Sequence, residues 1–544
     1  MYTRPVFKKG TKGQALIIAY MAIAFFMVVS AALIAKSFTE RGIALRNRLT
    51  AETFYMAEGA IENAIANFTS AIANYQISPS VASYNVTTTY TLFGSATVNT
   101  AITRAENNER IISEGGTIVY IREYDFVATA VHPQNNTIRA TVHQRIARRL
   151  IPTFQHAVFY NDDLEILPGA NMTLTGRIHS NQDIYIDAES GVTLTINTNY
   201  LYSAGDIFDQ RKDSGLPLAG EVRISVQGSS PTQYQAMNNL DCDDPSWQTA
   251  AITRWNGTVK SAVHGITELT APSVASIQPG GYYASNASVT VDNGALKKDG
   301  IPLIESRDYP PGTISSTTGT NFKNNREGQY ITMTNIDLAK LANVSGAISP
   351  VTHQPYPNNL PSNGLLYATT SGGANEPGIR LVNGSQIVRT GGLTVVSNDP
   401  VYIQGDYNTV NEQPTSVICD ALNLLSNAWS DPNSKSGLDS RVATQTTVNC
   451  AFIAGVDNTS SGHYNGGLEN YPRLHEKWTG INLNIKGSFV ELWHSAIATG
   501  DWVYGAPQYT APNRNWAYNT SFNDPAKLPP FTPWAVEARR VAWW

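Results

Sequence analysis

One stretch near the N-terminus constrains this chain more than any other feature. Residues 15–35 read ALIIAYMAIAFFMVVSAALIA and contain no charged side chain. Because an α-helix rises about 1.5 Å per residue, a helix of this length covers roughly 30 Å, which is the thickness of the hydrocarbon core of a bilayer. The sequence therefore predicts a single membrane-spanning helix.

A cleaved secretory signal is the alternative interpretation, because four basic residues precede the apolar stretch: Arg4, Lys8, Lys9 and Lys12. Signal peptides usually have a shorter apolar region, and no small-residue cleavage site lies between Ala35 and the polar run that follows it. We therefore favour a retained span. Basic residues near a span resist translocation, so we expect the N-terminus in the cytoplasm and the rest of the chain outside.

The helix is predicted to continue past the span. No proline occurs in residues 36–76, and Ile61, Ile65, Phe68 and Ile72 recur at spacings of four, three and four. This period places them on one face of a helix. We therefore expect an N-terminal domain of residues 1–76, with a transmembrane part at 15–35 and an amphipathic extension.

Two motifs carry a family resemblance. Residues 12–17 (KGQALI) before the span, and residues 54–62 (FYMAEGAIE) after it, resemble the N-terminal region of PilX-type minor pilins and of their relatives in type II secretion. The second motif contributes Ala57, Glu58, Gly59 and Glu62. In that family a prepilin peptidase cuts after the glycine, so the resemblance implies processing between Gly13 and Gln14. Gln14 stands where the family usually has Phe or Met, and Ile18 where it usually has glutamate.

The composition favours an exported β-rich protein. The 544 residues are enough for two to four domains, only 15% are charged, and the chain holds 41 glycines and 26 tyrosines. The formal net charge of -5 provides no basic field. Nucleic acid is therefore not expected as a partner.

Residues 77–153 are predicted to form a small antiparallel β domain. Tyr124, Phe126 and Ala128 alternate with other residues, as do Ile138 and Ala140 after a turn-like Pro-Gln-Asn-Asn at 133–136. This is typical of a hairpin with one buried face. We expect the sheet to pack on the amphipathic end of the helix.

From residue 154 to 505 the spacing predicts a right-handed β-solenoid (β-helix) head. Asp163, Asp183 and Asp206 each open a short apolar strand, and glycines mark the bends between them. A repeat near 20 residues is typical of stacked coils, each of which buries its apolar face only against the next. A long irregular insertion is expected at about 211–372, and an aromatic-rich C-terminal cap at 506–544, which ends in Trp543 and Trp544.

A short internal match supports the repeat. Residues 180–186 (SNQDIYI) and 397–403 (SNDPVYI) both begin with Ser-Asn and end with Tyr-Ile. We expect the two copies to occupy equivalent corners, with serine and asparagine turning the chain before a strand. The blocks at 421–429, 466–478 and 509–516 also resemble large solenoid-headed proteins that carry a PilX-type N-terminus.

The three cysteines leave two interpretations open. Cys242, Cys419 and Cys450 form no CxxC pattern, so a structural zinc site is not expected. Cys419 and Cys450 each lie in a short apolar run, and neighbouring strands would allow them to form a disulfide outside the cell. Buried free thiols are the other interpretation.

The candidate functional cluster is Glu469, Arg473, His475 and Glu476, within the densest polar segment of the chain. It offers an acid, a base and an anion-binding group, as a β-helix enzyme acting on polysaccharide would need. If the segment is helical, Arg473 and Glu476 would instead pair with each other. We favour this structural role. No catalytic residue, metal site or cofactor is predicted, and no nucleophile-elbow, P-loop or zinc-protease motif occurs.

The resemblance implies a structural subunit of a type IV pilus or of a type II secretion-like filament, and not an enzyme. Its expected location is the bacterial inner membrane before assembly and a cell-surface filament afterwards. Its expected partners are other pilin-like subunits, contacted through the N-terminal helix. A large head favours a place at the tip or in initiation. The alternatives are a membrane-tethered enzyme acting on polysaccharide and an adhesin that binds surface glycans.

Overall fold

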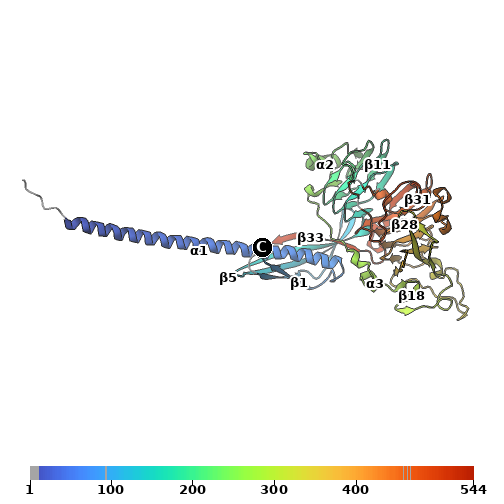
Figure 1. Cartoon of the computed structure of the whole chain (residues 1–544), viewed down its shortest axis with the longest axis horizontal. Helices are drawn as coiled ribbons and strands as arrows, with labels where there is room; N and C mark the ends of the chain where they lie inside the picture. Colours follow the sequence, from blue (N-terminus) through green and yellow to red (C-terminus); the bar gives the residue numbers. More distant parts are fainter. Residues whose placement is uncertain (1–11, 92–94, 458, 462, 466) are drawn as a thin grey trace, which may run out of the picture.

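One long helix begins the described part of the chain, and about half of it projects from the rest of the molecule. The computed structural model describes residues 12–91, 95–457, 459–461, 463–465 and 467–544. Helix α1 (Lys12–Ala73) is 62 residues long and contains no proline. Its N-terminal half projects away from the body, and its C-terminal half packs on a small sheet (Figure 1). The predicted continuation of the helix beyond the apolar stretch is therefore confirmed.

The sheet that covers α1 is antiparallel and has six strands in the order β1-β2-β4-β5-β33, with β3 beside β4. These strands are β1 (Ser83–Tyr90), β2 (Ala96–Arg104), β3 (Arg110–Glu114), β4 (Thr117–His132), β5 (Asn135–Pro152) and β33 (Trp534–Trp543). The predicted hairpin is confirmed as β4 and β5, in which Ala130 faces Ala140. The alternating side chains of β4 and β5 bury one face against the helix.

The predicted apolar stripe of α1 forms half of this core. Ile61, Phe68 and Ile72 are almost fully buried, and Ile65 packs at the margin. The Phe68 ring meets the Tyr124 and Phe126 rings edge-on, with centroids 4.8 and 5.6 Å apart. Aromatic pairs of this geometry add to the stabilisation that burial alone provides.

The last strand of the chain belongs to this N-terminal sheet. β33 pairs with β5, so that Val536 faces Leu150 and is buried in the helix–sheet core. Arg149 on β5 also forms an ion pair with Glu537 on β33, with 2.6 Å between Nε and Oε2. The cap expected over residues 506–544 does not include this final segment, which closes the edge of a different sheet.

The remaining strands form a mainly β head in which most pairings are parallel. Its strands before residue 261 are β6 (Val158–Tyr160), β7 (Leu164–Ile166), β8 (Met172–Thr175), β9 (Ile178–Ser180), β10 (Ile184–Ile186), β11 (Thr193–Asn197), β12 (Leu201–Ser203), β13 (Ile207–Phe208), β14 (Glu221–Ser225), β15 (Tyr234–Ala236) and β16 (Val259–Lys260). The later strands are β17 (Val289–Asp292), β18 (Ala295–Lys298), β19 (Ile301–Pro302), β20 (Ile314–Thr317), β21 (Lys323–Asn324), β22 (Gln329–Asp337), β23 (Leu365–Thr369), β24 (Glu376–Val382), β25 (Leu393–Val396), β26 (Val401–Gln404), β27 (Thr415–Cys419), β28 (Leu422–Leu425), β29 (Thr446–Ala454), β30 (Arg473–Leu474), β31 (Asn482–Glu491) and β32 (Asn513–Tyr518). Three short helices accompany them: α2 (Trp247–Trp255), α3 (Tyr282–Asn286) and α4 (Leu338–Leu341).

The strands of the predicted 20-residue repeat, β7, β10 and β13, pair in register with one another. Ile184 lies opposite Leu164 on one side and opposite Ile207 on the other, in parallel strands. The aspartates before these strands form a ladder, because the backbone N–H of Asp183 donates to Asp163 Oδ1 at 2.9 Å and that of Asp206 donates to Asp183 Oδ1 at 2.8 Å. Each carboxylate thus satisfies a donor that the turn would leave unpaired.

The two copies of the internal match also make the same turn. Ser180 Oγ accepts the backbone N–H of Gln182 at 3.2 Å, and Ser397 Oγ accepts that of Asp399 at 3.0 Å. Ser180 is the last residue of β9 and Ser397 directly follows β25, and both strands belong to the 13-stranded sheet. The predicted role of serine at these corners is confirmed.

The order of strands in space differs from their order in the chain. In the 13-stranded sheet the first head strand, β6, lies between β9 and β31, so the two ends of the head meet in the middle. The predicted insertion at 211–372 is also partly regular: β14, β17 and β22 within it pair in parallel with β11, β23 and β24. Apolar side chains along all these strands join one continuous core.

The placement of β33 gives a direct test. Val536→Asp puts a carboxylate into the helix–sheet core and is expected to lower the free energy of unfolding by about 3 kcal/mol or more. The matched control is Val541→Asp on the same strand, where the side chain is 52% exposed and the expected change is within about 0.5 kcal/mol. Chemical unfolding of the detergent-solubilised chain measures both. Equal effects of the two substitutions would contradict the position of β33.

Candidate functional site

The first candidate site is the exposed apolar surface of α1, formed by the side chains of residues 15–35. Within the described residues, α1 is the one helix long and apolar enough to cross a membrane, with a mean hydropathy of 2.6 over its most apolar window and none of that window buried. Its large side chains are 50–68% exposed: Leu16, Ile17, Ile18, Tyr20, Met21, Ile23, Phe25, Phe26, Met27, Val28, Leu33 and Ile34. A contiguous apolar surface of this extent marks contact with lipid or with other apolar surfaces.

The proposed processing point lies at the start of this surface. Gly13 and Gln14 fall in the first turns of α1 and are exposed, and no atom beyond the local backbone lies within 4 Å of the position that a Gly13 Cβ would take. The structure leaves this bond accessible, and cleavage there stays a prediction.

The motif at residues 57–62 is where the helix docks on its sheet. Ala57 is fully buried, and a Cβ on Gly59 would lie only 2.9 Å from the Tyr90 hydroxyl oxygen. Tyr90 uses that hydroxyl to donate to the Met56 carbonyl at 2.7 Å. Glu58 is half-buried beside them. Small residues therefore permit the close approach of α1 and β1, which gives the motif a packing role within one chain.

Glu62 lies one helical turn after Glu58 and reaches the last strand. Its carboxylate accepts two hydrogen bonds from Arg540 of β33, both 2.6 Å long. Both side chains are about half exposed, so this pair adds little to stability. It does connect the helix to the C-terminal end of the chain.

The predicted polar cluster of the head is buried but is not one site. The segment is not helical: it passes through a short 3-10 turn at Leu468–Asn470 into the two-residue strand β30. Arg473 forms a buried ion pair with Glu327, and Glu476 accepts hydrogen bonds from the Ser426 N–H and hydroxyl, both at 2.6 Å. The predicted Arg473–Glu476 pair is therefore wrong, because the extended backbone sends the two side chains to different partners.

His475 likewise has its own partner. Its Nε2 lies 2.8 Å from Asn423 Oδ1, and burial lowers the pKa of the imidazole to about 3. A histidine held neutral in this way contributes a hydrogen bond at neutral pH and no charge. Together with Glu476, which bonds to Ser426, it connects the segment that follows β30 to β28 and its end.

Glu469 is the exception in this cluster. It is only 3% exposed, and neither carboxylate oxygen has a hydrogen-bond partner in the part of the chain that the structure describes. Burial raises its pKa to about 7, and the nearby Arg514 offsets this only in part. An ionised carboxylate in such a place is costly, so the protonated form is favoured below neutral pH.

The three cysteines are free thiols. β27 and β29 pair as neighbours, as the disulfide hypothesis required, but Cys419 lies level with Ala454 and not with Cys450. The register therefore keeps the two sulfur atoms apart. Buried free thiols, the second interpretation, describe Cys419 and Cys450 in this structure.

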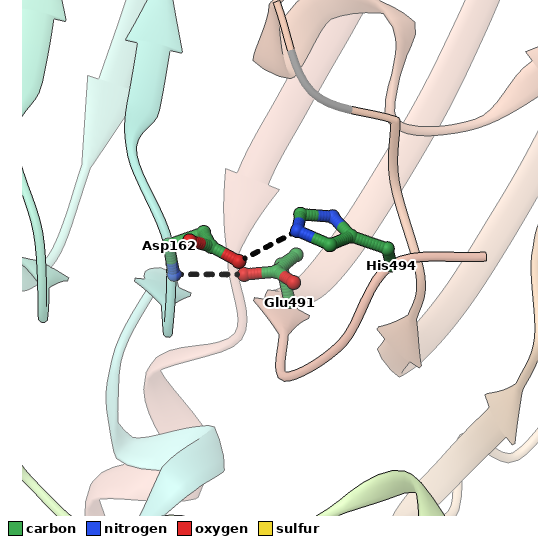
Figure 2. A group of neighbouring side chains, drawn as sticks. All are labelled: Asp162, Glu491 and His494. Atoms are coloured by element: carbon green, nitrogen blue, oxygen red, sulfur yellow. Dashed lines mark hydrogen bonds and ion pairs between the residues drawn. The ribbon is translucent and has the colours of Figure 1, made fainter.

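Sequence reasoning missed a second polar cluster, formed by Asp162, Glu491 and His494 (Figure 2). One ligand-type atom from each of the three side chains lies within 4.8 Å of the other two. The hydrogen bond to Asp162 raises the pKa of His494 to about 9, and burial raises that of Glu491 to about 8. Asp162 lies more than 300 positions before Glu491 and His494 in the chain, so no local spacing connects it with them.

Comparisons with known proteins identify no relative. No protein-family model, no curated protein and no solved structure matches this chain.

The environment of Glu469 predicts how stability depends on pH. Because its folded-state pKa of about 7 lies above the ordinary value of 4.5, the folded chain binds more protons than the unfolded chain between these values. Stability should then fall as pH rises through this window, by up to roughly 3 kcal/mol for this group. Glu469→Gln mimics the protonated acid, so it should match the parent at pH 5 and exceed its stability at pH 8.

The control for this measurement is Glu189→Gln, which changes an exposed glutamate of the same head. Thermal and chemical unfolding of the parent and both variants at pH 5 and pH 8 provide the comparison. An unchanged pH dependence in Glu469→Gln would show that this carboxyl group is not held protonated.

Proposed function

We propose that the chain is a structural subunit of a filament of the type IV pilus or type II secretion kind. The single observation that carries this proposal is α1: an exposed apolar half continues without a break into a half whose stripe is buried against a sheet of the same chain. The N-terminal half therefore requires lipid or another protein to bury its apolar side chains, and the C-terminal half attaches the body of the protein to the helix. The motifs at residues 12–17 and 54–62 support the same proposal through their resemblance to PilX-type minor pilins.

The apolar half has two successive environments in this proposal. Before assembly it spans the bacterial inner membrane, with its basic flank in the cytoplasm and the head outside. In the filament it packs beside the same helix of other subunits, and the small residues Ala19, Ala22, Ala24, Ala31 and Ala32 permit close approach. Exchanging lipid contacts for helix contacts changes the hydrophobic free energy little.

The head is proposed to be a right-handed β-solenoid. In support, strands roughly 20 residues apart pair in parallel, and the aspartate ladder repeats at the same corner of each unit. The parallel pairing from β16 through β6 and β31 to β17 extends the same arrangement through both parts of the head. A head of this bulk is difficult to repeat along a thin filament. We therefore place the subunit at the tip or in initiation.

The terminal tryptophans fit subunit contact better than glycan binding by the head. The Trp543 ring meets the Phe54 ring of α1 edge-on at 6.3 Å, and the Trp544 ring stacks on His143 of β5 at 5.7 Å. Both tryptophans remain more than half exposed, beside the helix. They form an exposed aromatic surface of their own near Phe54 and His143.

Processing tests the proposal. The mature protein is expected to begin at Gln14, to remain with membranes, and to be released with sheared surface filaments. Gly13→Val should block cleavage and incorporation, because the family's peptidase cuts after glycine, whereas Gly42→Ala at an exposed position of the same helix should leave both unchanged. N-terminal sequencing of protein from membranes and from sheared material measures this. A mature start beyond Ala35 would contradict the proposal.

A further inference from the structure

The cluster of Asp162, Glu491 and His494 lies where the two ends of the head meet. Glu491 is the last residue of β31, level with Tyr160 at the end of β6, and Asp162 follows two positions later. His494 comes from the loop that leaves β31 (Figure 2). A group bound here would therefore connect the first strand of the head to its last long strand.

The polar groups of the cluster are not all satisfied. Two carboxyl groups share one imidazole, whose Nε2 lies 3.0 Å from Asp162 Oδ2. The Glu491 side chain is fully buried; its Oε2 accepts the N–H groups of Asn161 and Asp162 at 3.0 and 3.2 Å, but its Oε1 has no hydrogen-bond partner among the described residues. A buried carboxylate oxygen without a partner is costly. A cation would satisfy it.

The histidine is oriented as a metal ligand. Its Nδ1 lies 3.2 Å from the Val456 carbonyl oxygen, to which it donates, and this leaves Nε2 as the nitrogen that faces Asp162 and Glu491. Metal-binding histidines usually donate their other ring nitrogen to a carbonyl or carboxylate in this way. The backbone contact therefore fixes the tautomer that binding requires.

We propose that these three side chains bind one divalent transition-metal cation of the Zn²⁺ class. The ligands are Nε2 of His494, one oxygen of Asp162 and one oxygen of Glu491, and the cation replaces both the proton on Nε2 and the proton of the Glu491 carboxyl group, which leave to solvent. Imidazole nitrogen favours Zn²⁺ over Ca²⁺ and Mg²⁺, which prefer oxygen ligands throughout. The side chains of Asp162 and His494 are 36% and 46% exposed, so water can occupy the fourth position. The bound cation would hold β6 and β31 together.

This inference does not depend on the filament proposal and is tested on purified protein. The full chain in detergent is stripped with EDTA, dialysed and titrated with ZnCl₂ against a chromogenic chelator. We expect one Zn²⁺ per chain, a higher unfolding temperature with Zn²⁺, and at least ten-fold weaker binding in Asp162→Asn, His494→Gln and Glu491→Gln. Asp162 and His494 are partly exposed, so their variants decide the question even if the buried Glu491→Gln fails to fold.

The matched control is Asp501→Asn. Asp501 pairs with His463 at 3.7 Å on the surface, and no third acidic side chain joins this pair in a metal-binding group within the described residues. Zn²⁺ binding should be unchanged in this variant. Absence of binding by the parent, or equal affinity in the parent, Asp162→Asn and His494→Gln, would overturn the proposal. Displacement of Zn²⁺ by an equal concentration of Ca²⁺ would overturn the assigned class of cation.

Discussion

The rest of the structure depends on the contrast between the two halves of α1. A helix of 62 residues is held straight by its own hydrogen bonds, but only its second half buries an apolar face within the chain. The first half exposes leucine, isoleucine, methionine and phenylalanine on all sides, and this pattern is stable only in lipid or among other apolar helices. The proposed membrane attachment and the proposed subunit contact would therefore both be properties of one continuous element.

The last strand of the chain returns to this helix. β33 closes the sheet that covers α1, and Arg149 joins β5 to Glu537 across 388 positions of sequence. The head is thus formed by the residues between β5 and β33, and the chain connects both of its ends to the sheet of the N-terminal domain. The helix and its sheet also contact the head directly: the Tyr75 ring stacks on the Tyr282 ring at 3.6 Å, and the backbone of Thr270 bonds to that of Val536.

Short-range sequence patterns predicted the features that depend on neighbouring residues. The stripe of Ile61, Phe68 and Ile72 identified the buried face of the helix, alternation identified the β4–β5 hairpin, and the repeated aspartates identified strands that stack in parallel. Pairings between distant segments left no such signal. Nothing near Trp534–Trp543 indicates that this strand pairs with β5, and nothing in residues 154–160 shows that β6 lies beside β31.

Polar side chains were harder to place for the same reason. The density of charge at residues 469–476 correctly marked an unusual segment, but the partner of Arg473 is Glu327 and that of Glu476 is Ser426, which only the tertiary fold brings close. Asp162, Glu491 and His494 come together through the meeting of the two ends of the head. Chemistry that depends on such long-range contacts is read from the structure and not from spacing.

Measuring the surroundings of α1 in membranes tests most directly whether one helix passes from an apolar environment into the body of the protein. A nitroxide attached at position 24, in the exposed apolar half, is compared with one at position 66, on the exposed face of the sheet-bound half. The account predicts that the label at 24 is reached by oxygen and shielded from a water-soluble paramagnetic reagent, with the opposite at 66. Equal access of the water-soluble reagent to both labels would contradict it.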